Sequence, residues 1–189
     1  MSVGKMVIVS GPSGAGKTTI VKQLIQNCSL PLQISISATT REPRPGEVDG
    51  VDYQFLADDE FRQLRSEGEF LECFEVFGRG YWYGTLREPV TTSLQQGNWV
   101  ILEIDVQGMS QVVEQFPDAI SFFVRPESLA ELERRLRGRG TEAEETIQRR
   151  LEVARHEWQF KDRYRFDIVN NRLNETVKEM CDQLLAELR

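Results

Sequence analysis

Near the N-terminus stands the octet Gly11-Pro12-Ser13-Gly14-Ala15-Gly16-Lys17-Thr18, which fits the pattern G-x-x-x-x-G-K-S/T. The short apolar run over residues 6–9 predicts a buried parallel strand before it, and residues 18–26 carry apolar side chains at helical spacing after it. In this order of strand, loop and helix, backbone N–H groups at the helix N-terminus can hold phosphate oxygens. We therefore expect the octet to bind a nucleoside triphosphate, with Lys17 at the β- and γ-phosphates and Thr18 as a ligand of Mg²⁺.

Strand and helix patterns alternate along the chain and predict an α/β fold, a P-loop NTPase fold with a parallel sheet covered by helices. The strands are expected over residues 6–10, 33–37, 99–104, 119–124 and 167–169, and the helices over about 17–27, 109–116, 128–137, 142–161 and 174–188. We expect a single domain over residues 1–189, whose core comprises residues 1–37 and 98–189.

Two segments interrupt the alternation. Residues 38–97 are rich in turns and aromatic side chains, with strand candidates over 53–56 and 70–77, and they predict an inserted substrate-binding lobe. Residues 137–145 carry arginines around glycines at the end of a helix, and they predict a short, mobile arginine-bearing lid.

Composition excludes several classes of protein. The net charge of −7 argues against a nucleic-acid partner, which would need a basic face. No apolar stretch approaches the roughly 20 residues that span a bilayer, and the N-terminus runs into the first strand without a leader pattern, so we expect no membrane partner and a cytoplasmic location. The sequence leaves a monomer and a homo-oligomer both open.

The three cysteines, Cys28, Cys73 and Cys181, lie far apart and show no CxxC spacing. An odd number at such distances supports neither a disulfide framework nor a zinc site. We expect all three to be reduced packing residues.

Positive charge is concentrated in two places although the chain is acidic. Arg41 and Arg44 form one group, and a second group comprises Arg134, Arg135, Arg137, Arg139, Arg149, Arg150 and Arg155. Such clusters suit a small polyanionic ligand. Their alternative explanations are a solvated turn for the first group and a solvated helix face for the second.

A phosphate-binding loop alone does not separate kinases from GTPases, ATPases or motors, but a further set of motifs does. In order, these are Ser-Ala-Thr-Thr-Arg-Glu-Pro-Arg-Pro-Gly-Glu over 37–47, Asp-Tyr-Gln-Phe over 52–55, Gly-Glu-Phe-Leu-Glu over 68–72, Tyr-Gly-Thr over 83–85, Glu-Ile-Asp-Val-Gln-Gly over 103–108, Arg-Leu-Arg-Gly-Arg-Gly-Thr over 135–141, Ile-Gln-Arg-Arg-Leu over 147–151 and Ile-Val-Asn over 168–170. Over about residues 4–186 the chain resembles the guanylate kinases, which are P-loop nucleoside monophosphate kinases.

The resemblance implies transfer of the γ-phosphoryl group of ATP to GMP, and to dGMP, with Mg²⁺ as cofactor. On the donor side it places the whole octet and Asn170 at ATP, and it places Thr18 and Asp105 near the metal. The cations that it implies at the phosphates during transfer are Lys17, Arg41, Arg135, Arg139 and Arg150, and cations are what such a reaction needs most. For Asp105, which follows a predicted strand, a helix N-cap is the equal alternative.

On the acceptor side the resemblance implies that Arg41 and Arg44 hold the GMP phosphate, with help from the hydroxyls of Tyr53 and Tyr83. About two extra residues precede Tyr83 relative to the family, which leaves open whether Tyr81 or Tyr83 faces the phosphate. The residues implied at the base are Ser37, Glu72, Thr85 and Glu103, the last standing where many relatives have Asp.

Glu72 suits guanine on its own chemistry. Guanine presents N1–H and N2–H₂ as donors, whereas adenine presents a lone pair at N1, so a carboxylate favours guanine. Taken alone, Glu72 between two phenylalanines would more often be an outward-facing strand residue.

Three other functions remain open, and the least favoured is a P-loop GTPase switch, because the sequence has no NKxD-type guanine motif. The second is a non-catalytic binding module on the same fold, which the intact Lys17 and Thr18 disfavour. The third is a kinase of a different phosphorylated small molecule, which would have no use for Ser37, Glu72 and Thr85.

Overall fold

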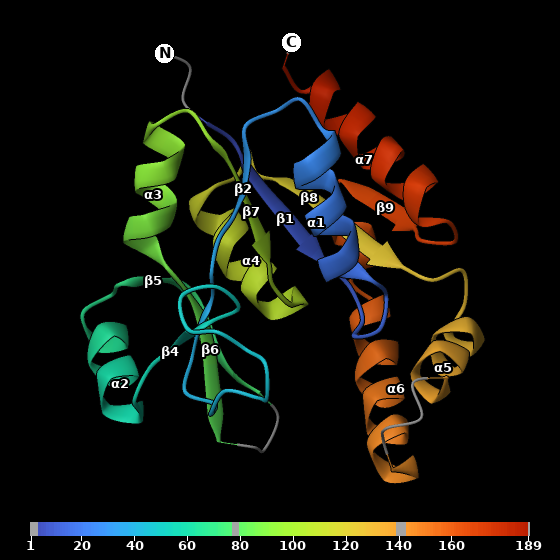
Figure 1. Cartoon of the computed structure of the whole chain (residues 1–189), viewed down its shortest axis with the longest axis horizontal. Helices are drawn as coiled ribbons and strands as arrows, with labels where there is room; N and C mark the ends of the chain where they lie inside the picture. The colour runs from blue at the N-terminus through green and yellow to red at the C-terminus, as the bar shows by residue number, and fades with distance from the viewer. Residues whose placement is uncertain (1–3, 77–79, 139–142, 189) are drawn as a thin grey trace.

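The computed structural model describes residues 4–76, 80–138 and 143–188. Its main sheet has five strands in the order β2 (Leu32–Ile34), β7 (Trp99–Glu103), β1 (Met6–Ser10), β8 (Ile120–Arg125) and β9 (Phe166–Val169). All neighbouring strands in it are parallel. The strand that leads into the phosphate-binding loop therefore lies at the centre of the sheet (Figure 1).

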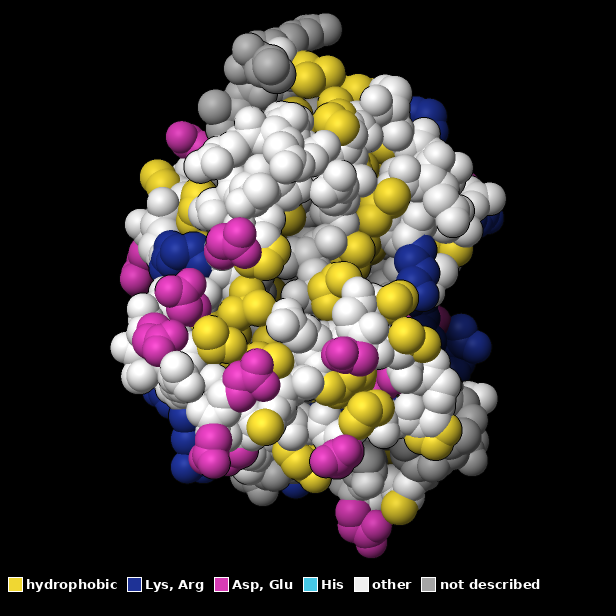
Figure 2. All heavy atoms as spheres, turned by 60° about the vertical axis from the view of Figure 1, so that its left-hand side comes forward, with side chains coloured by type: hydrophobic (Ala, Val, Ile, Leu, Met, Phe, Trp, Pro, Cys, Tyr) yellow, Lys and Arg dark blue, Asp and Glu magenta, His cyan; other side chains and the backbone are white. Residues whose placement is uncertain are grey.

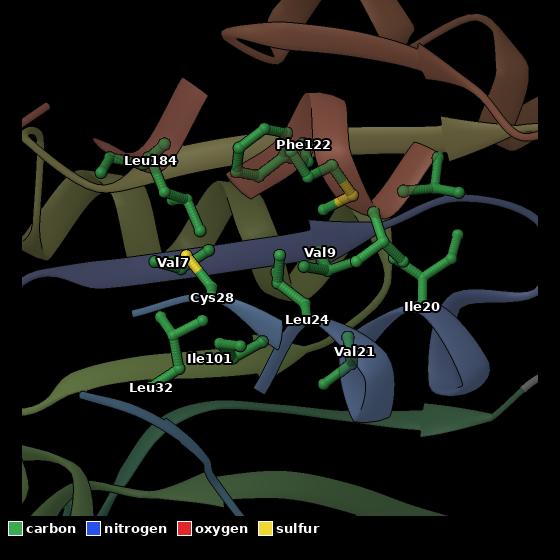
Figure 3. Close-up of a cluster of buried hydrophobic side chains, with 14 of the residues drawn as sticks. Val7, Val9, Ile20, Val21, Leu24, Cys28, Leu32, Ile101, Phe122 and Leu184 are labelled. Atoms are coloured by element: carbon green, nitrogen blue, oxygen red, sulfur yellow. The ribbon is translucent and has the colours of Figure 1, made fainter. Parts of the chain in front are cut away.

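Helices cover both faces of this sheet, which explains why its two neighbouring strands β1 and β7 carry unbroken apolar runs, over residues 6–9 and 99–102. Alternate residues of β1 point to opposite faces. Val7 and Val9 pack with α1 (Lys17–Asn27) and α7 (Leu173–Ala186), as Figure 3 shows for α1. The intervening residues Met6 and Ile8 belong to a second core, which includes side chains from α3 (Arg87–Gln95) and α4 (Val106–Gln115).

Two further helices stand beside the loop end of the sheet (Figure 1). α5 (Leu129–Arg137) and α6 (Glu144–Trp158) pack against each other through Leu132, Leu136 and Leu151, which are buried. A short 3₁₀ helix, η1 (Lys161–Arg163), then leads into β9.

The segment between β2 and α3 forms a second, smaller sheet. Its four strands lie in the order β4 (Gln54–Phe55), β3 (Ala38–Thr39), β6 (Tyr81–Leu86) and β5 (Phe70–Val76), and α2 (Asp58–Ser66) packs on it. Phe61 of α2 stacks on Phe70 with ring centroids 4.4 Å apart. Figure 2 shows this side of the molecule, where acidic side chains are spread over the surface around small apolar areas.

All five strands predicted for the main sheet are present, although β2 ends at Ile34 and not at residue 37. Two helices were not predicted, α2 and α3. In α2 only Phe61 is buried, so the sequence lacks the apolar periodicity that indicates a helix. α3 packs on the main sheet through Val90 and Leu94.

The prediction of three reduced cysteines was wrong for two of them. Cys28 and Cys181 form a disulfide, with Cα atoms 5.7 Å apart and a separation of 153 positions in sequence. The cause is the packing of α7 along α1, which brings the residue after α1 next to the last turns of α7. Cys73 is a free thiol.

Among the described residues, no helix has the length and apolar character needed to cross a bilayer. The cytoplasmic location, the absence of a nucleic-acid partner and the oligomeric state stay predictions.

Candidate active site

A cleft of about 350 Å³ opens between the carboxyl ends of β1 and β7, the second sheet and α6. In parallel α/β sheets this end of the strands is where ligands bind. Residues expected at the donor nucleotide line one part of it, namely Gly11, Ser13, Lys17 and Asp105. Residues expected at the acceptor line another part, namely Ser37, Tyr53, Glu72, Tyr83 and Glu103. The fold thus brings together two groups that the sequence keeps apart.

The phosphate-binding loop is held in shape by its glycines. Gly11, Gly14 and Gly16 have φ angles of 133°, 97° and 93°, a region that other residues rarely adopt. Gly16 caps α1 without a side-chain hydrogen bond, so the first N–H groups of the helix remain available to an anion. Lys17 Nζ lies back on the loop and donates to the carbonyl oxygen of Gly11 at 2.7 Å.

Neighbouring side chains brace this loop. Asn170 Nδ2 donates to the carbonyl oxygen of Ala15 at 2.8 Å, and the Asn170 side chain is buried. On the open side, Arg150 Nη2 donates to Ser13 Oγ at 2.6 Å. Pro12 and Ala15 are buried in the loop, so their contribution to binding is restricted to backbone groups.

Thr18, in the first turn of α1, donates through Oγ1 to Glu103 Oε1 at 2.8 Å. The contact follows from sheet register, because Glu103 is paired with Val9 at the end of β1. Asp105 is the N-cap of α4, and its Oδ1 accepts from the N–H groups of Gln107 at 2.9 Å and Gly108 at 2.8 Å. Burial raises the pKa of Asp105, while these two hydrogen bonds act against the shift.

Within the part of the chain that the structure describes, no group of three or more His, Cys, Asp or Glu could by itself hold a metal ion. A few protein oxygens near the phosphate-binding loop are enough for Mg²⁺ that binds together with a nucleotide, because Mg²⁺ usually takes one or two protein oxygens plus phosphate oxygens and water. Thr18, Glu103 and Asp105 supply only oxygen donors.

Arg41 is buried and already held in place. Its Nη1 and Nη2 donate to the two carboxylate oxygens of Glu47 at 2.9 and 3.0 Å, and its Nε donates to Tyr83 OH at 2.9 Å. The ring centroid of Tyr53 lies 5.3 Å from Arg41 Cζ. The hydrogen bond from Arg41 holds the pKa of Glu47 below its ordinary value.

These contacts separate the alternatives for the acceptor side. Tyr83 is the tyrosine that reaches Arg41, whereas Tyr81 is 39% exposed. The side chain of Arg44 is exposed, and its backbone N–H donates to Glu47 Oε2 at 2.8 Å. Arg41 is therefore a fixed cation, and Arg44 lies on the solvent side of the same turn.

Glu72 points inward, so the alternative of an outward-facing strand residue was wrong. The residue is only 3% exposed, and its Oε1 accepts from Thr85 Oγ1 at 2.6 Å. Its Oε2 is buried and has no hydrogen-bond partner among the described residues. Burial raises the pKa of Glu72 to about 7, and the negative charge of Asp105 adds to the shift. A buried acceptor without a donor is costly, so this oxygen points to a ligand that supplies one.

The arginines expected to act during transfer lie at the α5 and α6 side. Arg135 donates through Nε to Glu131 at 2.7 Å and through Nη2 to the carbonyl oxygen of Asn170 at 2.8 Å. Arg137 bridges the two helices by pairing with Glu133 and Glu144. Arg139 and the middle of the predicted lid, residues 139–142, lie outside the described residues.

Sequence reasoning missed Glu157, which lines the cleft from α6. Its Oε2 is buried without a partner among the residues described, and burial raises its pKa to about 7, an effect that the charge of Lys17 partly opposes. The available signal was its spacing, since Glu157 follows the buried Ala154 by three residues on one helix face. Phe74, beside Tyr83, was missed as well.

The phosphate-binding loop follows the central strand of a parallel sheet and opens into the cleft. This arrangement defines the class of P-loop nucleotide-binding proteins. Comparison with known proteins makes the class specific. Residues 3–187 match the family model described as guanylate kinase. The chain belongs to the guanylate kinase family.

Individual relatives agree with this assignment. A guanylate kinase of Rhodopirellula baltica is 53% identical over 185 residues, which is 97% of this chain and 88% of the relative. One of Caldanaerobacter subterraneus is 42% identical over 184 residues, with 97% and 88% covered. The crystal structure of guanylate kinase from Anaplasma phagocytophilum superposes with a TM-score of 0.80 at 33% identity, covering 98% of this chain and 87% of that one. The main sheet and its flanking helices therefore have the P-loop NTPase fold that was predicted.

Proposed function

We propose that this chain transfers the γ-phosphoryl group of ATP to GMP, giving GDP and ADP, and that the cleft holds both nucleotides. The observation that carries the proposal is the free, buried Oε2 of Glu72 in the same cleft as Lys17. Guanine can supply the donor that this oxygen lacks, whereas adenine presents a lone pair at the corresponding position. We expect dGMP to serve as well.

On the donor side, we assign the β- and γ-phosphates to the backbone N–H groups of the loop, which Gly11 and residues 13–18 supply and Pro12 lacks. Lys17 would exchange the Gly11 carbonyl for phosphate oxygens, which are stronger acceptors for an ammonium group. Asn170 acts on ATP through the loop that it braces. Mg²⁺, when bound at Thr18 with Asp105 nearby, would neutralise charge on the phosphate oxygens.

The acceptor phosphate is assigned to Arg41 and Arg44, with the hydroxyls of Tyr53 and Tyr83. Arg41 is prepared for this role because Glu47 and Tyr83 already fix the plane of its guanidinium group. Such preorganisation lowers the entropy lost on binding. Arg44 is exposed and can close over the phosphate from solvent.

The base is assigned to Glu72, with Thr85 fixing its carboxylate and Ser37 on the cleft wall. Glu103 lines the same cleft, but its Oε1 is engaged by Thr18. We therefore assign Glu103 first to the metal side, and its expected contact with guanine stays a prediction.

The remaining cations stabilise charge during transfer. Arg150 reaches the loop through Ser13, and Arg135 lies one hydrogen bond from Asn170. Together with Lys17, Arg41 and Arg139, they would surround the phosphoryl group when the lid closes. An in-line transfer of this kind depends on positioning and on positive charge more than on a base.

The test is Glu72→Gln, assayed with ATP, Mg²⁺ and either GMP or AMP. The variant keeps the shape of the side chain but replaces an acceptor oxygen with a donor. The transition-state stabilisation for GMP, calculated from kcat/KM, should therefore fall by about 2–4 kcal/mol, while kcat/KM for AMP should stay the same or improve. Glu75→Gln, on the exposed side of the same strand, is the matched control. An unchanged GMP to AMP ratio in Glu72→Gln would remove Glu72 from the base site.

A further inference from the structure

We propose that Gly108 is a positioning residue for guanine selectivity, because its missing side chain leaves the space in which the Glu72 carboxylate lies. The proposal rests on the assignment of Glu72 to the base. It adds a residue on a different element, the first turn of α4, to the determinants of substrate choice.

The contact between the two residues is close. A Cβ atom built on Gly108 would lie 2.9 Å from Glu72 Oε2, 3.2 Å from Cδ and 3.3 Å from Cγ. The three nearest atoms all belong to Glu72, and the nearest is the oxygen without a partner. A methyl group at this position would therefore press on the atom that we assign to guanine.

The backbone does not explain the glycine. Gly108 lies in the first turn of α4, and it is absent from the glycines with positive φ, unlike Gly11, Gly14 and Gly16. Glycine is a poorer helix former than alanine, by about 1 kcal/mol in a helix interior. The chain therefore carries a poor helix former where only the side-chain space requires it.

Glu72 has little freedom to move away from a larger neighbour. Thr85 holds its Oε1 at 2.6 Å, and the side chain is buried. α4 is also tied to β5 on both sides of Glu72: the Cys73 N–H donates to Gln111 Oε1 at 3.4 Å, and Gln115 Nε2 donates to the Leu71 carbonyl oxygen at 2.7 Å. A methyl group would thus displace the carboxylate more readily than it would separate the helix from the strand.

The donor side should be unaffected by the same change. The N–H of Gly108 donates to Asp105 Oδ1 at 2.8 Å, and alanine keeps this N–H. The helix cap and the position of Asp105 are therefore retained, and the effect should fall on GMP and not on ATP.

The experiment measures kcat and KM for GMP, AMP and ATP in the full chain and in Gly108→Ala. We expect KM for GMP to rise and the GMP to AMP ratio of kcat/KM to fall by about tenfold to a hundredfold, as for small misplacements of a binding group. KM for ATP should change by less than about twofold, because a misplacement confined to the Glu72 carboxylate does not reach the donor side. Ser110→Ala, two positions further along α4, is the matched control and should leave the ratio unchanged.

A double-mutant cycle shows whether Gly108 acts through Glu72. In a Glu72→Ala background the Gly108→Ala change should not alter the GMP to AMP ratio further, because the displaced carboxylate is gone. Urea unfolding of the same four proteins adds a second readout: Gly108→Ala should lower stability less in the Glu72→Ala background than in the parent chain. This comparison still applies if Gly108→Ala alone folds poorly.

The outcomes are distinct. If Glu72→Gln changes the GMP to AMP ratio and Gly108→Ala does not, the proposal for Gly108 is wrong and the assignment of Glu72 stands. Equal effects of Gly108→Ala in both backgrounds would also overturn it. If Glu72→Gln leaves the ratio unchanged, the assignment of the base site itself fails.

Discussion

Thr18 Oγ1 donates a hydrogen bond to Glu103 Oε1 at 2.8 Å, although the two residues are 85 positions apart in sequence. The bond links the first turn of α1 to the end of β7, which lies next to β1 in the sheet. A threonine hydroxyl that gives its proton to a carboxylate turns its lone pairs outward, where a cation can use them. Glu103, expected at guanine, therefore lies next to the residue expected at the metal.

The first prediction concerns Glu103. Glu103→Gln removes a negative charge and weakens the acceptor for Thr18, so the Mg²⁺ concentration that gives half-maximal activity should rise about tenfold, as for other partners of metal ligands. Titration of activity with Mg²⁺ at fixed ATP and GMP measures this. A changed GMP to AMP ratio with an unchanged Mg²⁺ response would instead return Glu103 to the base.

The two arginines of the acceptor side should differ. Arg41→Ala should raise KM for GMP strongly and also lower the free energy of unfolding by about 1–3 kcal/mol, because Glu47 and Tyr83 lose their common partner. Arg44→Ala should raise KM for GMP with stability changed by less than about 0.5 kcal/mol, since its side chain is exposed. Steady-state kinetics and urea unfolding of both variants check this, and KM for ATP should stay the same. A loss of ATP binding equal to that of GMP would show that Arg41 mainly supports the fold.

The buried carboxyl of Glu157 should make stability depend on pH. Its pKa is raised from 4.5 to about 7, so in this range the folded protein holds a proton that the unfolded chain releases. The free energy of unfolding should therefore fall as pH rises from about 4.5 through 7. Glu157→Gln removes this dependence and should stabilise the protein at pH 8 by up to roughly 3 kcal/mol.

Urea unfolding at pH 5 and pH 8 measures the effect of Glu157→Gln, with Glu152→Gln on the exposed side of α6 as the control. Glu72, also raised to about 7, contributes with the same sign and is retained in both variants. An identical pH dependence in Glu157→Gln and the parent chain would show that Glu157 is not protonated in this range.

The disulfide gives a prediction that needs no assay of activity. Thiol titration of the unfolded, unreduced chain should find one thiol per molecule, from Cys73, and three after reduction. Reduction should also lower the melting temperature, because the link between Cys28 and Cys181 restricts the unfolded chain. Three thiols without reductant would restore the expectation of reduced packing residues.

Much of the fold could be predicted because it depends on local patterns. The strand over residues 6–10, the glycine-rich loop and the helix over 17–27 are where the sequence predicted them. A run of apolar residues predicts a strand that is buried on both faces, and helical spacing predicts one apolar face. α2 and α3 were missed because each buries only one or two side chains.

The sequence by itself determined the phosphate-binding loop, since three glycines, a lysine and a threonine at fixed spacing interact through the backbone of one short segment. The contacts between distant segments were decided only by the tertiary structure. Thr18 meets Glu103, and Cys28 meets Cys181, because strand order and helix packing place them side by side. The free oxygen of Glu72 likewise exists only because β5 packs on α4 at a glycine. Burial and charge act through space, so the distance between two side chains, and with it their pKa and partners, depends on how the elements pack.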